Sequence, residues 1–228
     1  MERIGIFGGS FNPVHLGHVN IARSAIRDLS LDRLYVMPAA VSPFKQGTRE
    51  SAFDRMMLVR AAFNGMEKVT VDGRELARGG VSYAIDTVRE LKGEHPGSEL
   101  FFIIGEDSVE GLPRWKDIEE LKRLCEFKAY PRTRESSTEV RRRLAAGEEI
   151  GSLVPVAVEL LLRHKVVCNR DNPALADAVL AGLARKGGYC PCRLAKSPEN
   201  FCICSEFKSQ LADENFHGLC HCRLYQKP

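Results

Sequence analysis

Residues 5–19 read GIFGGSFNPVHLGHV, and this stretch decides the predicted fold. An apolar run over residues 2–7 ends in the two glycines at 8–9. Apolar residues then recur at helical spacing through residues 15–29. The stretch therefore predicts a strand, a tight glycine turn and a helix, in that order.

The glycine turn and the start of the helix suit a phosphate group. Backbone N–H groups point outward at a helix N-terminus, and glycine lets a phosphate approach the backbone closely because it has no Cβ. His15 and His18 lie three residues apart on the first helical turn, so their side chains share one face. Two imidazoles at such a turn can donate hydrogen bonds to a phosphoryl group as its negative charge grows.

Strand and helix patterns alternate along the rest of the chain. They predict strands at 32–39, 69–73, 99–107 and 125–130, and helices at 53–63, 82–92, 118–124, 136–147 and 154–164. This alternation is typical of an α/β fold, a Rossmann-like doubly wound parallel sheet with helices on both faces. Such sheets bind ligands at the carboxyl ends of their strands, which is where the glycine turn lies.

The composition excludes some classes of function. The chain has 228 residues, 44% hydrophobic and 28% charged, as in ordinary globular proteins, and its net charge of +3 is too small to argue for nucleic acid. The arginines at 141–143 fit a solvated helix face. No apolar stretch approaches the ~20 residues of a membrane span, and no basic leader precedes a long apolar region. We expect a cytoplasmic protein that binds neither nucleic acid nor membrane.

The cysteine content changes along the chain. Six of the eight cysteines lie at or beyond residue 190, after a helix predicted at 172–188. We therefore expect two domains, 1–165 and 166–228, the second a small α domain. Cytoplasmic cysteine clusters favour metal binding or redox catalysis over structural disulfides. The other two cysteines, Cys125 and Cys168, are expected to be structural.

The six C-terminal cysteines form three Cys-x-Cys pairs. The pairs are Cys190 with Cys192, Cys202 with Cys204, and Cys220 with Cys222. Six thiols exceed the four that one zinc ion or one [4Fe–4S] cluster needs. The two remaining thiols would make a redox pair. A zinc-bound module that only mediates protein contacts stays open as the alternative.

The segment GGSFNPVHLGH resembles the signature of the nucleotidyltransferase superfamily, and more narrowly of bacterial nicotinate-nucleotide adenylyltransferases. Four further segments resemble that family in the same order: MPAAVSPFK (37–45), VSYAIDTVRELK (81–92), FFIIGEDSVEGLPRWKDIEEL (101–121) and SSTEVRRRL (136–144). The resemblance covers roughly residues 1–165. It implies transfer of AMP from ATP to nicotinate mononucleotide, a step of NAD biosynthesis, without a covalent enzyme intermediate.

The resemblance also implies roles for single residues of this chain. His15 and His18 would be catalytic and stabilise the α-phosphate of ATP. The implied ATP-binding residues are Gly8, Gly9, Ser10, Phe11, Gly105, Asp107, Ser137, Thr138 and Arg141. The implied mononucleotide-binding residues are Lys45, which would hold the phosphate, Tyr83, Ala84 and Trp115, which would stack on the ring. Mg²⁺ would bridge the ATP phosphates, mostly through water.

The sequence departs from the family pattern at two places. Ala84 stands where the family usually has a threonine whose hydroxyl helps to read the nicotinate carboxylate. Only twenty residues separate Trp115 from Ser136, so an edge strand is expected to be missing and the site for the distal phosphates to be displaced. A degenerate nucleotide-binding domain that regulates the second domain therefore remains a rival interpretation.

The C-terminal segment resembles the catalytic subunit of ferredoxin–thioredoxin reductase. The resemblance is carried by NPALADAVLAGLARKGGYCPCR (172–193), FCICSEF (201–207) and GLCHCRLY (218–225), and it covers about residues 168–228. It implies a [4Fe–4S] cluster on Cys190, Cys202, Cys204 and Cys220. It implies an active disulfide between Cys192 and Cys222, with His221 as proton donor. Ferredoxin would supply electrons, and a thioredoxin-like protein would receive them.

Overall fold

The computed structural model describes residues 1–44, 51–169 and 171–228. Lys45, the predicted phosphate ligand of the mononucleotide, therefore lies outside the described residues.

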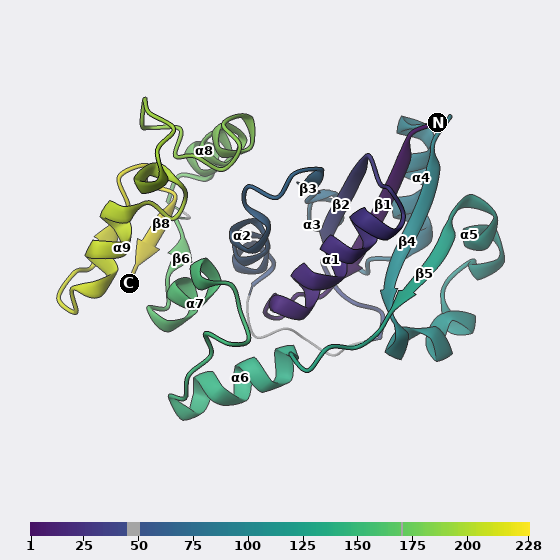
Figure 1. The fold of residues 1–228 in the computed structure, drawn as a ribbon, viewed down its shortest axis with the longest axis horizontal. Helices are drawn as coiled ribbons and strands as arrows, with labels where there is room; N and C mark the ends of the chain where they lie inside the picture. Colours follow the sequence, from purple (N-terminus) through teal and green to yellow (C-terminus); the bar gives the residue numbers. More distant parts are fainter. Residues whose placement is uncertain (45–50, 170) are drawn as a thin grey trace.

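A parallel sheet forms the centre of the larger part of the molecule (Figure 1). Its strands are β1 (Arg3–Gly9), β2 (Arg33–Pro38), β3 (Val69–Val71), β4 (Glu99–Gly105) and β5 (Glu126–Tyr130). The strands lie in the order β3-β2-β1-β4-β5 and pair in parallel, with Gly9 opposite Pro38 and Ile6 opposite Phe102. The order reverses between β1 and β4, and such a reversal creates a crevice at the carboxyl ends of the two strands. The predicted Rossmann-like sheet is confirmed.

Helices surround this sheet close to where the sequence predicts them. They are α1 (Leu16–Asp28), α2 (Ala52–Phe63), α3 (Arg74–Arg78), α4 (Ala84–Glu94), α5 (Ile118–Leu124), α6 (Ser137–Ala146) and α7 (Val156–Arg163). A 3₁₀ helix, η1 (Glu106–Arg114), follows β4. The helix α3 and the 3₁₀ helix η1 were not predicted, and α3 is too short to give a helical repeat of apolar residues.

Alternate strand residues pack into two separate cores, one on each face of the sheet. Ile6 and Phe102 belong to the core that includes α4 and α5, whereas Phe7 and Phe101 belong to the core that includes α1 and α2. A parallel sheet covered on both faces needs apolar side chains on both, so its strands read as nearly continuous apolar runs.

The chain leaves the sheet after β5. Residues 131–136 connect β5 directly to α6, and within the described residues β5 pairs with no strand other than β4. This agrees with the edge strand expected to be missing. Thr133 of the connection lies against Gly17 at the start of α1, so closely that a Cβ on Gly17 would overlap the Thr133 hydroxyl.

The C-terminal segment mixes helices with a second, antiparallel sheet. Its elements are β6 (Val167–Cys168), α8 (Pro173–Arg185), η2 (Pro198–Asn200), α9 (Ser205–Ala212), β7 (Gly218–Leu219) and β8 (Tyr225–Lys227). The sheet has the order β6-β8-β7. The prediction of a purely α domain was therefore wrong. Strands of two or three residues show no alternation of polar and apolar side chains, and Val167 finds its partner, Gln226, far along the chain.

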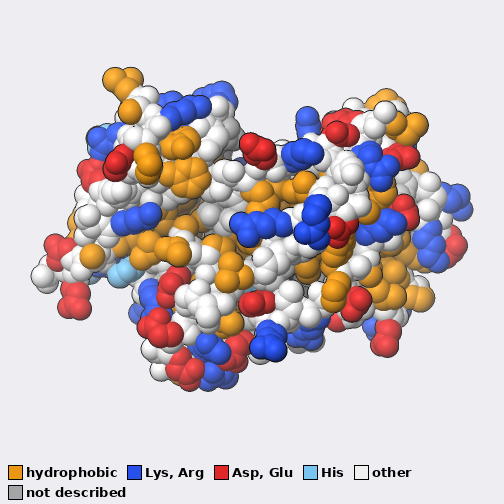
Figure 2. Space-filling view, in the orientation of Figure 1, with side chains coloured by type: hydrophobic (Ala, Val, Ile, Leu, Met, Phe, Trp, Pro, Cys, Tyr) orange, Lys and Arg blue, Asp and Glu red, His pale blue; other side chains and the backbone are white. Residues whose placement is uncertain are grey.

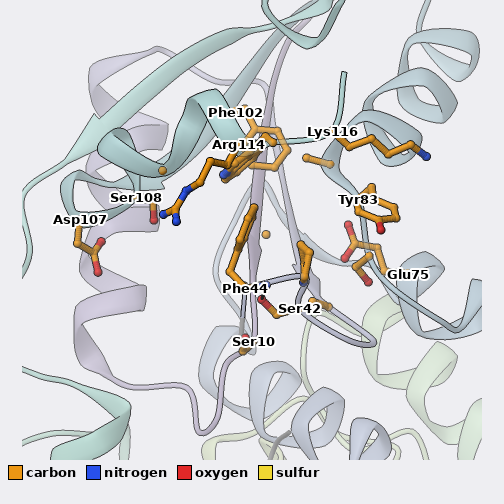
Figure 3. A pocket seen from close by; sticks show the side chains of 18 residues that line it. Ser10, Ser42, Phe44, Glu75, Tyr83, Phe102, Asp107, Ser108, Arg114 and Lys116 are labelled. Carbon is orange, nitrogen blue, oxygen red and sulfur yellow. Dashed lines mark hydrogen bonds between the residues drawn. The ribbon is translucent and has the colours of Figure 1, made fainter. Parts of the chain in front are cut away.

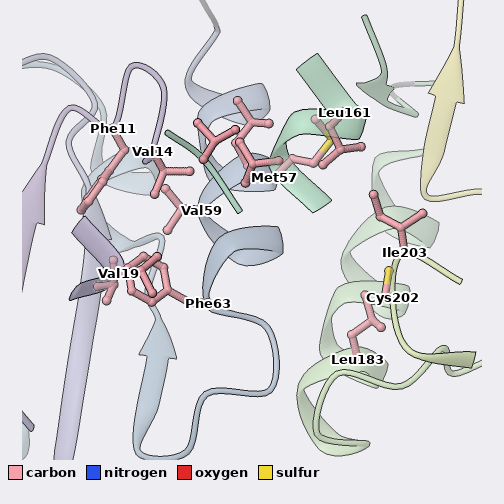
Figure 4. Close-up of a cluster of buried hydrophobic side chains, with 14 of the residues drawn as sticks. Phe11, Val14, Val19, Met57, Val59, Phe63, Leu161, Leu183, Cys202 and Ile203 are labelled. Carbon is pink, nitrogen blue, oxygen red and sulfur yellow. The ribbon is translucent and has the colours of Figure 1, made fainter. Parts of the chain in front are cut away.

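The larger core continues from the parallel sheet into the C-terminal segment (Figure 4). Helix α2 lies between the parallel sheet and the C-terminal segment. Its Phe63 packs in the same cluster as Val19 of α1. Its Met57 belongs to the same cluster as Leu161 of α7 and Cys202. The two parts of the chain are thus joined by buried apolar side chains and not only by the backbone.

Charged side chains of both signs are interspersed on the face of the molecule that Figure 2 shows, in keeping with the small net charge. Over residues 1–44, 51–169 and 171–228, no helix is long and apolar enough to cross a membrane.

Candidate active site and cysteine cluster

A cavity of about 540 Å³ opens at the carboxyl ends of the central strands (Figure 3). The residues predicted from the sequence that line it are Gly8, Gly9, Ser10, Tyr83, Ala84, Asp107 and Trp115. They come from segments far apart in the sequence, and they meet because parallel strands end at the same edge of the sheet.

His15 and His18 lie at the start of α1, just after the glycine turn. Their ring centroids are 3.7 Å apart, and the His15 side chain is buried. The backbone N–H of His15 donates to Nδ1 of His18 over 3.1 Å. Because Nδ1 accepts this bond, a neutral His18 ring carries its proton on Nε2. Nε2 lies on the opposite side of the ring from this bond, and neither histidine is among the residues that line the cavity.

Phe11 packs against the His18 ring. Its side chain is buried, and its ring meets that of His18 edge to face with centroids 4.8 Å apart. The side chain predicted to bind ATP therefore packs in the core, where it orients His18.

Helix α6 lies against the loop that precedes the histidines. The Ser137 hydroxyl donates to the Pro13 carbonyl over 2.9 Å, and the Arg141 guanidinium donates to the Asn12 carbonyl. Arg141 also contacts the Thr138 hydroxyl. The short connection from β5 thus leaves Ser137 and Arg141 beside the segment that leads into His15, although none of the three α6 residues lines the cavity.

Aromatic rings surround Trp115. Phe44 faces it in a nearly parallel orientation, with centroids 6.3 Å apart and planes 28° apart. Phe102 and Phe127 meet the Trp115 ring edge to face at 5.5 Å and 5.9 Å. Phe44 and Trp115 both line the cavity, so they offer flat apolar faces to a bound ring.

The start of α4 forms another part of the wall, with Tyr83 and Ala84. The Lys116 ammonium lies 4.6 Å from the centre of the Tyr83 ring, a cation–π contact. Glu75 is a buried carboxylate nearby that accepts a hydrogen bond from the Thr87 hydroxyl over 2.7 Å. Burial raises the pKa of Glu75, and the Thr87 bond partly offsets this rise.

The end of β4 carries the last two predicted residues. Asp107 lines the cavity from the start of η1, whereas Gly105 does not. Gly105 is nonetheless needed for the approach of Asp107, because a Cβ on Gly105 would lie 2.5 Å from the Asp107 carboxylate.

Sequence reasoning missed several residues of this wall. They include Ser42, Phe44, Glu75, Ser108, Arg114 and Lys116. Arg114 and Lys116 flank Trp115, so their position next to a predicted site residue was a usable signal. Glu75 carried no such signal, because a glutamate in a short polar stretch resembles any surface residue.

Residues 6–161 match the family model described as cytidylyltransferase-like. A curated relative from Shouchella clausii, named "Probable nicotinate-nucleotide adenylyltransferase", is 40% identical over 191 residues that cover 75% of this chain and all of the relative. A relative of the same name from Gemmatimonas aurantiaca is 36% identical over 68% of this chain and 87% of its own length.

The chain belongs to the nicotinate-nucleotide adenylyltransferase family.

Solved structures of the family share its fold. A nicotinate-nucleotide adenylyltransferase structure from Vibrio parahaemolyticus is 26% identical, with a TM-score of 0.61 over 71% of this chain and 99% of that one. A Plasmodium falciparum nicotinic acid mononucleotide adenylyltransferase complexed with NaAD has a TM-score of 0.59 at 16% identity, over 72% of this chain and 97% of that one. The family model ends at residue 161, before the cysteine-rich segment begins.

Five of the C-terminal cysteines gather around one small cavity. Cys190, Cys202, Cys204, Cys220 and Cys222 are buried and line it together with Ile203, Phe207 and Tyr225. Cys192 and His221 are exposed. Cys125 is buried far away in the other core, as predicted, where burial raises its pKa to about 12.

The cysteine thiols of this cluster differ in their acidity. Cys220 and Cys222 lie 3.5 Å apart between sulfurs, and the Tyr225 N–H donates to the Cys220 sulfur over 3.2 Å. The bond from Cys222, together with backbone donors, lowers the pKa of Cys220 to about 7. Burial and the neighbouring Cys190 raise the pKa of Cys192, so this thiol is mostly protonated at neutral pH.

The geometry of the cysteines does not by itself define a metal site. Among the described side chains, no three His, Cys, Asp or Glu residues converge as the ligands of one metal ion do. The predicted iron–sulfur domain is therefore not shown, and only the grouping of the cysteines around one cavity is observed.

Proposed function

We propose that the chain catalyses transfer of AMP from ATP to nicotinate mononucleotide, with release of pyrophosphate, in NAD biosynthesis. The main support is that the glycine turn and Trp115 line the same cavity. The chain also matches the family model over residues 6–161. The mononucleotide phosphate attacks the α-phosphorus of ATP directly. Such a reaction needs positioning and charge stabilisation, and it needs no protein nucleophile.

The glycine turn and the histidines would hold the α-phosphate. Gly8, Gly9 and Ser10 line the cavity, so their backbone N–H groups would bind the phosphate. Nε2 of His18, whose ring is oriented by the bond to Nδ1, would add a donor. His15 lies within 3.7 Å of the His18 ring and would share the phosphoryl charge. Donors set in place before the reaction stabilise the growing charge without reorganising.

The first turn of α6 would bind the distal phosphates of ATP. The N–H groups of Ser137 and Thr138 lie at a helix N-terminus, where the backbone favours anions. The Arg141 guanidinium is held by the Asn12 carbonyl, and a phosphate would compete for that guanidinium. Gly105 and Asp107 would hold the ribose. Mg²⁺, entering with ATP, would offset the phosphate charge and bind mostly through water.

The mononucleotide would lie in the other half of the cavity. Its ring would stack between Phe44 and Trp115, and its carboxylate would face the start of α4 at Tyr83 and Ala84. Lys45 would hold its phosphate.

The test is dinucleotide formation from ATP and nicotinate mononucleotide in the presence of Mg²⁺. Wild type and the double variant His15→Ala, His18→Ala are compared in the same assay. The proposal predicts a clear loss of rate in the double variant. Equal rates would instead support the rival interpretation, a degenerate domain that only binds nucleotide.

We infer, for residues 166–228, a disulfide reductase unit with a [4Fe–4S] cluster. The observation that favours it is the grouping of five buried cysteines around one cavity, with the sixth at the surface. The donors fit such a cluster in kind and number, because it requires four cysteine thiolates, although their side chains do not converge on one point as ligands do. Cys190, Cys202, Cys204 and Cys220 would hold the cluster, which when bound would supply electrons one at a time.

The remaining cysteines would carry the disulfide chemistry. Cys192 is the exposed thiol that could attack a target disulfide, and Cys222 would then displace the target thiol. The exposed His221 would supply the proton that the released target thiolate takes up. Ferredoxin would be the electron donor and a thioredoxin-like protein the target.

Metal analysis separates this unit from a zinc-bound interaction module. The full chain is purified without oxygen, and iron, sulfide and zinc are counted on the sample used for the adenylyltransfer assay. Four irons and four sulfides per chain are expected for the reductase. Zinc without iron would favour the interaction module.

A further inference from the structure

Helix α2 contacts the glycine turn near its N-terminus. Arg55 is 1% exposed, and its guanidinium donates to two backbone carbonyls, that of Ser10 over 2.8 Å and that of Ala40 over 3.2 Å. Ser10 lines the cavity, and Ala40 follows Ala39, which also lines it. A buried charge with these partners fixes α2 to the loop on which the proposed phosphate donors lie.

The other end of α2 contacts the cysteine-rich segment. Asn64 ends the helix, and its side-chain amide donates to the Cys202 carbonyl over 2.8 Å and to the Gly188 carbonyl over 3.2 Å. The packing is tight here, because a Cβ on Gly188 would overlap the Asn64 carboxamide. Asn64 thus connects α2 directly to the backbone of a cysteine in the buried cluster.

The helix between these two contacts is surrounded by packed side chains. Met57, Val59 and Phe63 belong to the core that joins the parallel sheet to the C-terminal segment (Figure 4). Residues 55 and 64 are separated by about 13 Å along a helix. Because protein cores are close-packed, a displacement at one end of such a helix is passed on to the other.

We propose that Arg55 and Asn64 are positioning residues through which the cysteine-rich segment holds the glycine turn in its working geometry. The inference rests on the proposed adenylyl transfer. Displacement of the Gly188 and Cys202 backbone moves Asn64 and α2. Arg55 then moves the Ser10 carbonyl, and the adjacent N–H groups no longer meet the ATP phosphates. The C-terminal segment therefore acts on ATP affinity although none of its described residues lines the cavity.

Two neighbouring glycines give a matched test. Gly187 and Gly188 both have positive φ values, +65° and +92°, so alanine strains the backbone at either site. A Cβ on Gly188 would meet Asn64 and also the Phe201 ring, at 2.9 Å, whereas no atom of the described residues lies within 4 Å of a Cβ on Gly187. We expect Gly188→Ala to raise KM and Kd for ATP roughly three- to tenfold, with a smaller change in kcat. Gly187→Ala should leave both ATP constants unchanged.

A double variant identifies Asn64 as the connection. Asn64→Ala should raise KM for ATP to a similar degree, and adding Gly188→Ala should raise it no further, because both changes interrupt the same contact. Fully additive effects, or equal ATP constants for the two glycine variants, would overturn the proposal. If Gly188→Ala does not fold, Asn64→Ala alone decides. If the wild-type protein forms no dinucleotide, the proposed function is refuted. The Kd values of the same variants for ATP still test whether the C-terminal segment affects ATP binding.

Discussion

The backbone N–H of His15 donates to Nδ1 of His18, while the two imidazole rings lie 3.7 Å apart between centroids. One bond thus places one nitrogen of His18 against the helix end and leaves the other nitrogen to carry the proton. Under the proposed function, orienting the ring and donating to phosphate would be divided between the two nitrogens of this side chain.

This division can be tested with two replacements of His18. The amide of His18→Asn can occupy the Nδ1 position and keep the bond to His15, but it lacks a donor at the Nε2 position. His18→Gln reaches the Nε2 position and keeps the donor. We expect the asparagine variant to lose ~10²–10³ in kcat with little change in thermal stability, by analogy with loss of one oxyanion donor. The glutamine variant should be faster, and a slower or equal rate would contradict the assignment of the donor.

Ala84 should weaken the preference for the acid mononucleotide over the amide. The residue lies at the start of α4 in the cavity wall, where the family usually has a threonine. A hydrogen bond to a charged group contributes about 1.5–3 kcal/mol, so Ala84→Thr should raise the ratio of kcat/KM values, acid over amide, roughly ten- to hundredfold. An unchanged ratio would mean that backbone groups alone read the carboxylate.

Binding of the mononucleotide ring should depend on Phe44 as well as on Trp115. The two rings are nearly parallel across 6.3 Å, and Phe44 is 53% exposed without a ligand. Phe44→Ala should raise KM for the mononucleotide about two- to tenfold, the effect of losing one aromatic contact of ~0.5–1.5 kcal/mol. KM for ATP should stay constant. The exposed Val41→Ala serves as the control, and a matching rise there would refute stacking by Phe44.

The cysteines should divide into two groups. Replacing any of the proposed ligands, Cys190, Cys202, Cys204 or Cys220, by serine should abolish bound iron and much of the fold of the segment, because metal binding and folding are coupled. Cys192→Ser should keep iron and fold but lose disulfide reduction, since the attacking thiol is gone. Cys222→Ser should also keep iron. Anaerobic iron and sulfide counts on all six variants measure this, and loss of iron from Cys192→Ser would show the roles to be assigned wrongly.

Glu75 should make stability depend on pH. Burial raises its pKa above the ordinary value of 4.5, so the native state binds this proton more tightly than the unfolded state. The resulting stabilisation is fully present below the ordinary pKa of 4.5 and is lost as pH rises through the higher pKa of the folded state. Glu75→Gln keeps an acceptor for Thr87 and cannot ionise. Wild type should therefore lose stability relative to this variant as pH rises above 4.5 in denaturant titrations, and parallel curves would contradict the raised pKa.

The sequence by itself determined the parallel sheet and most of its helices. Local pattern was sufficient because α1 repeats its apolar spacing over several turns and β4 is a continuous apolar run. The glycine turn, the histidine pair and Trp115 were also visible, since the spacing of residues within one segment is a local property. The grouping of cysteines in pairs at 190–222 was equally local.

Only the tertiary structure decided which segments meet. The short strands β6 and β8 pair Val167 with Gln226, and a strand of two residues has no pattern that sequence reasoning can detect. Arg55 lies within the predicted helix 53–63 and Asn64 directly after it, and neither carries a local signal, yet the fold buries Arg55 and joins Asn64 to Cys202 across 138 positions of the chain. The physical reason is that partners of buried polar groups are chosen by packing between elements, and packing over such separations leaves no periodic trace in the sequence.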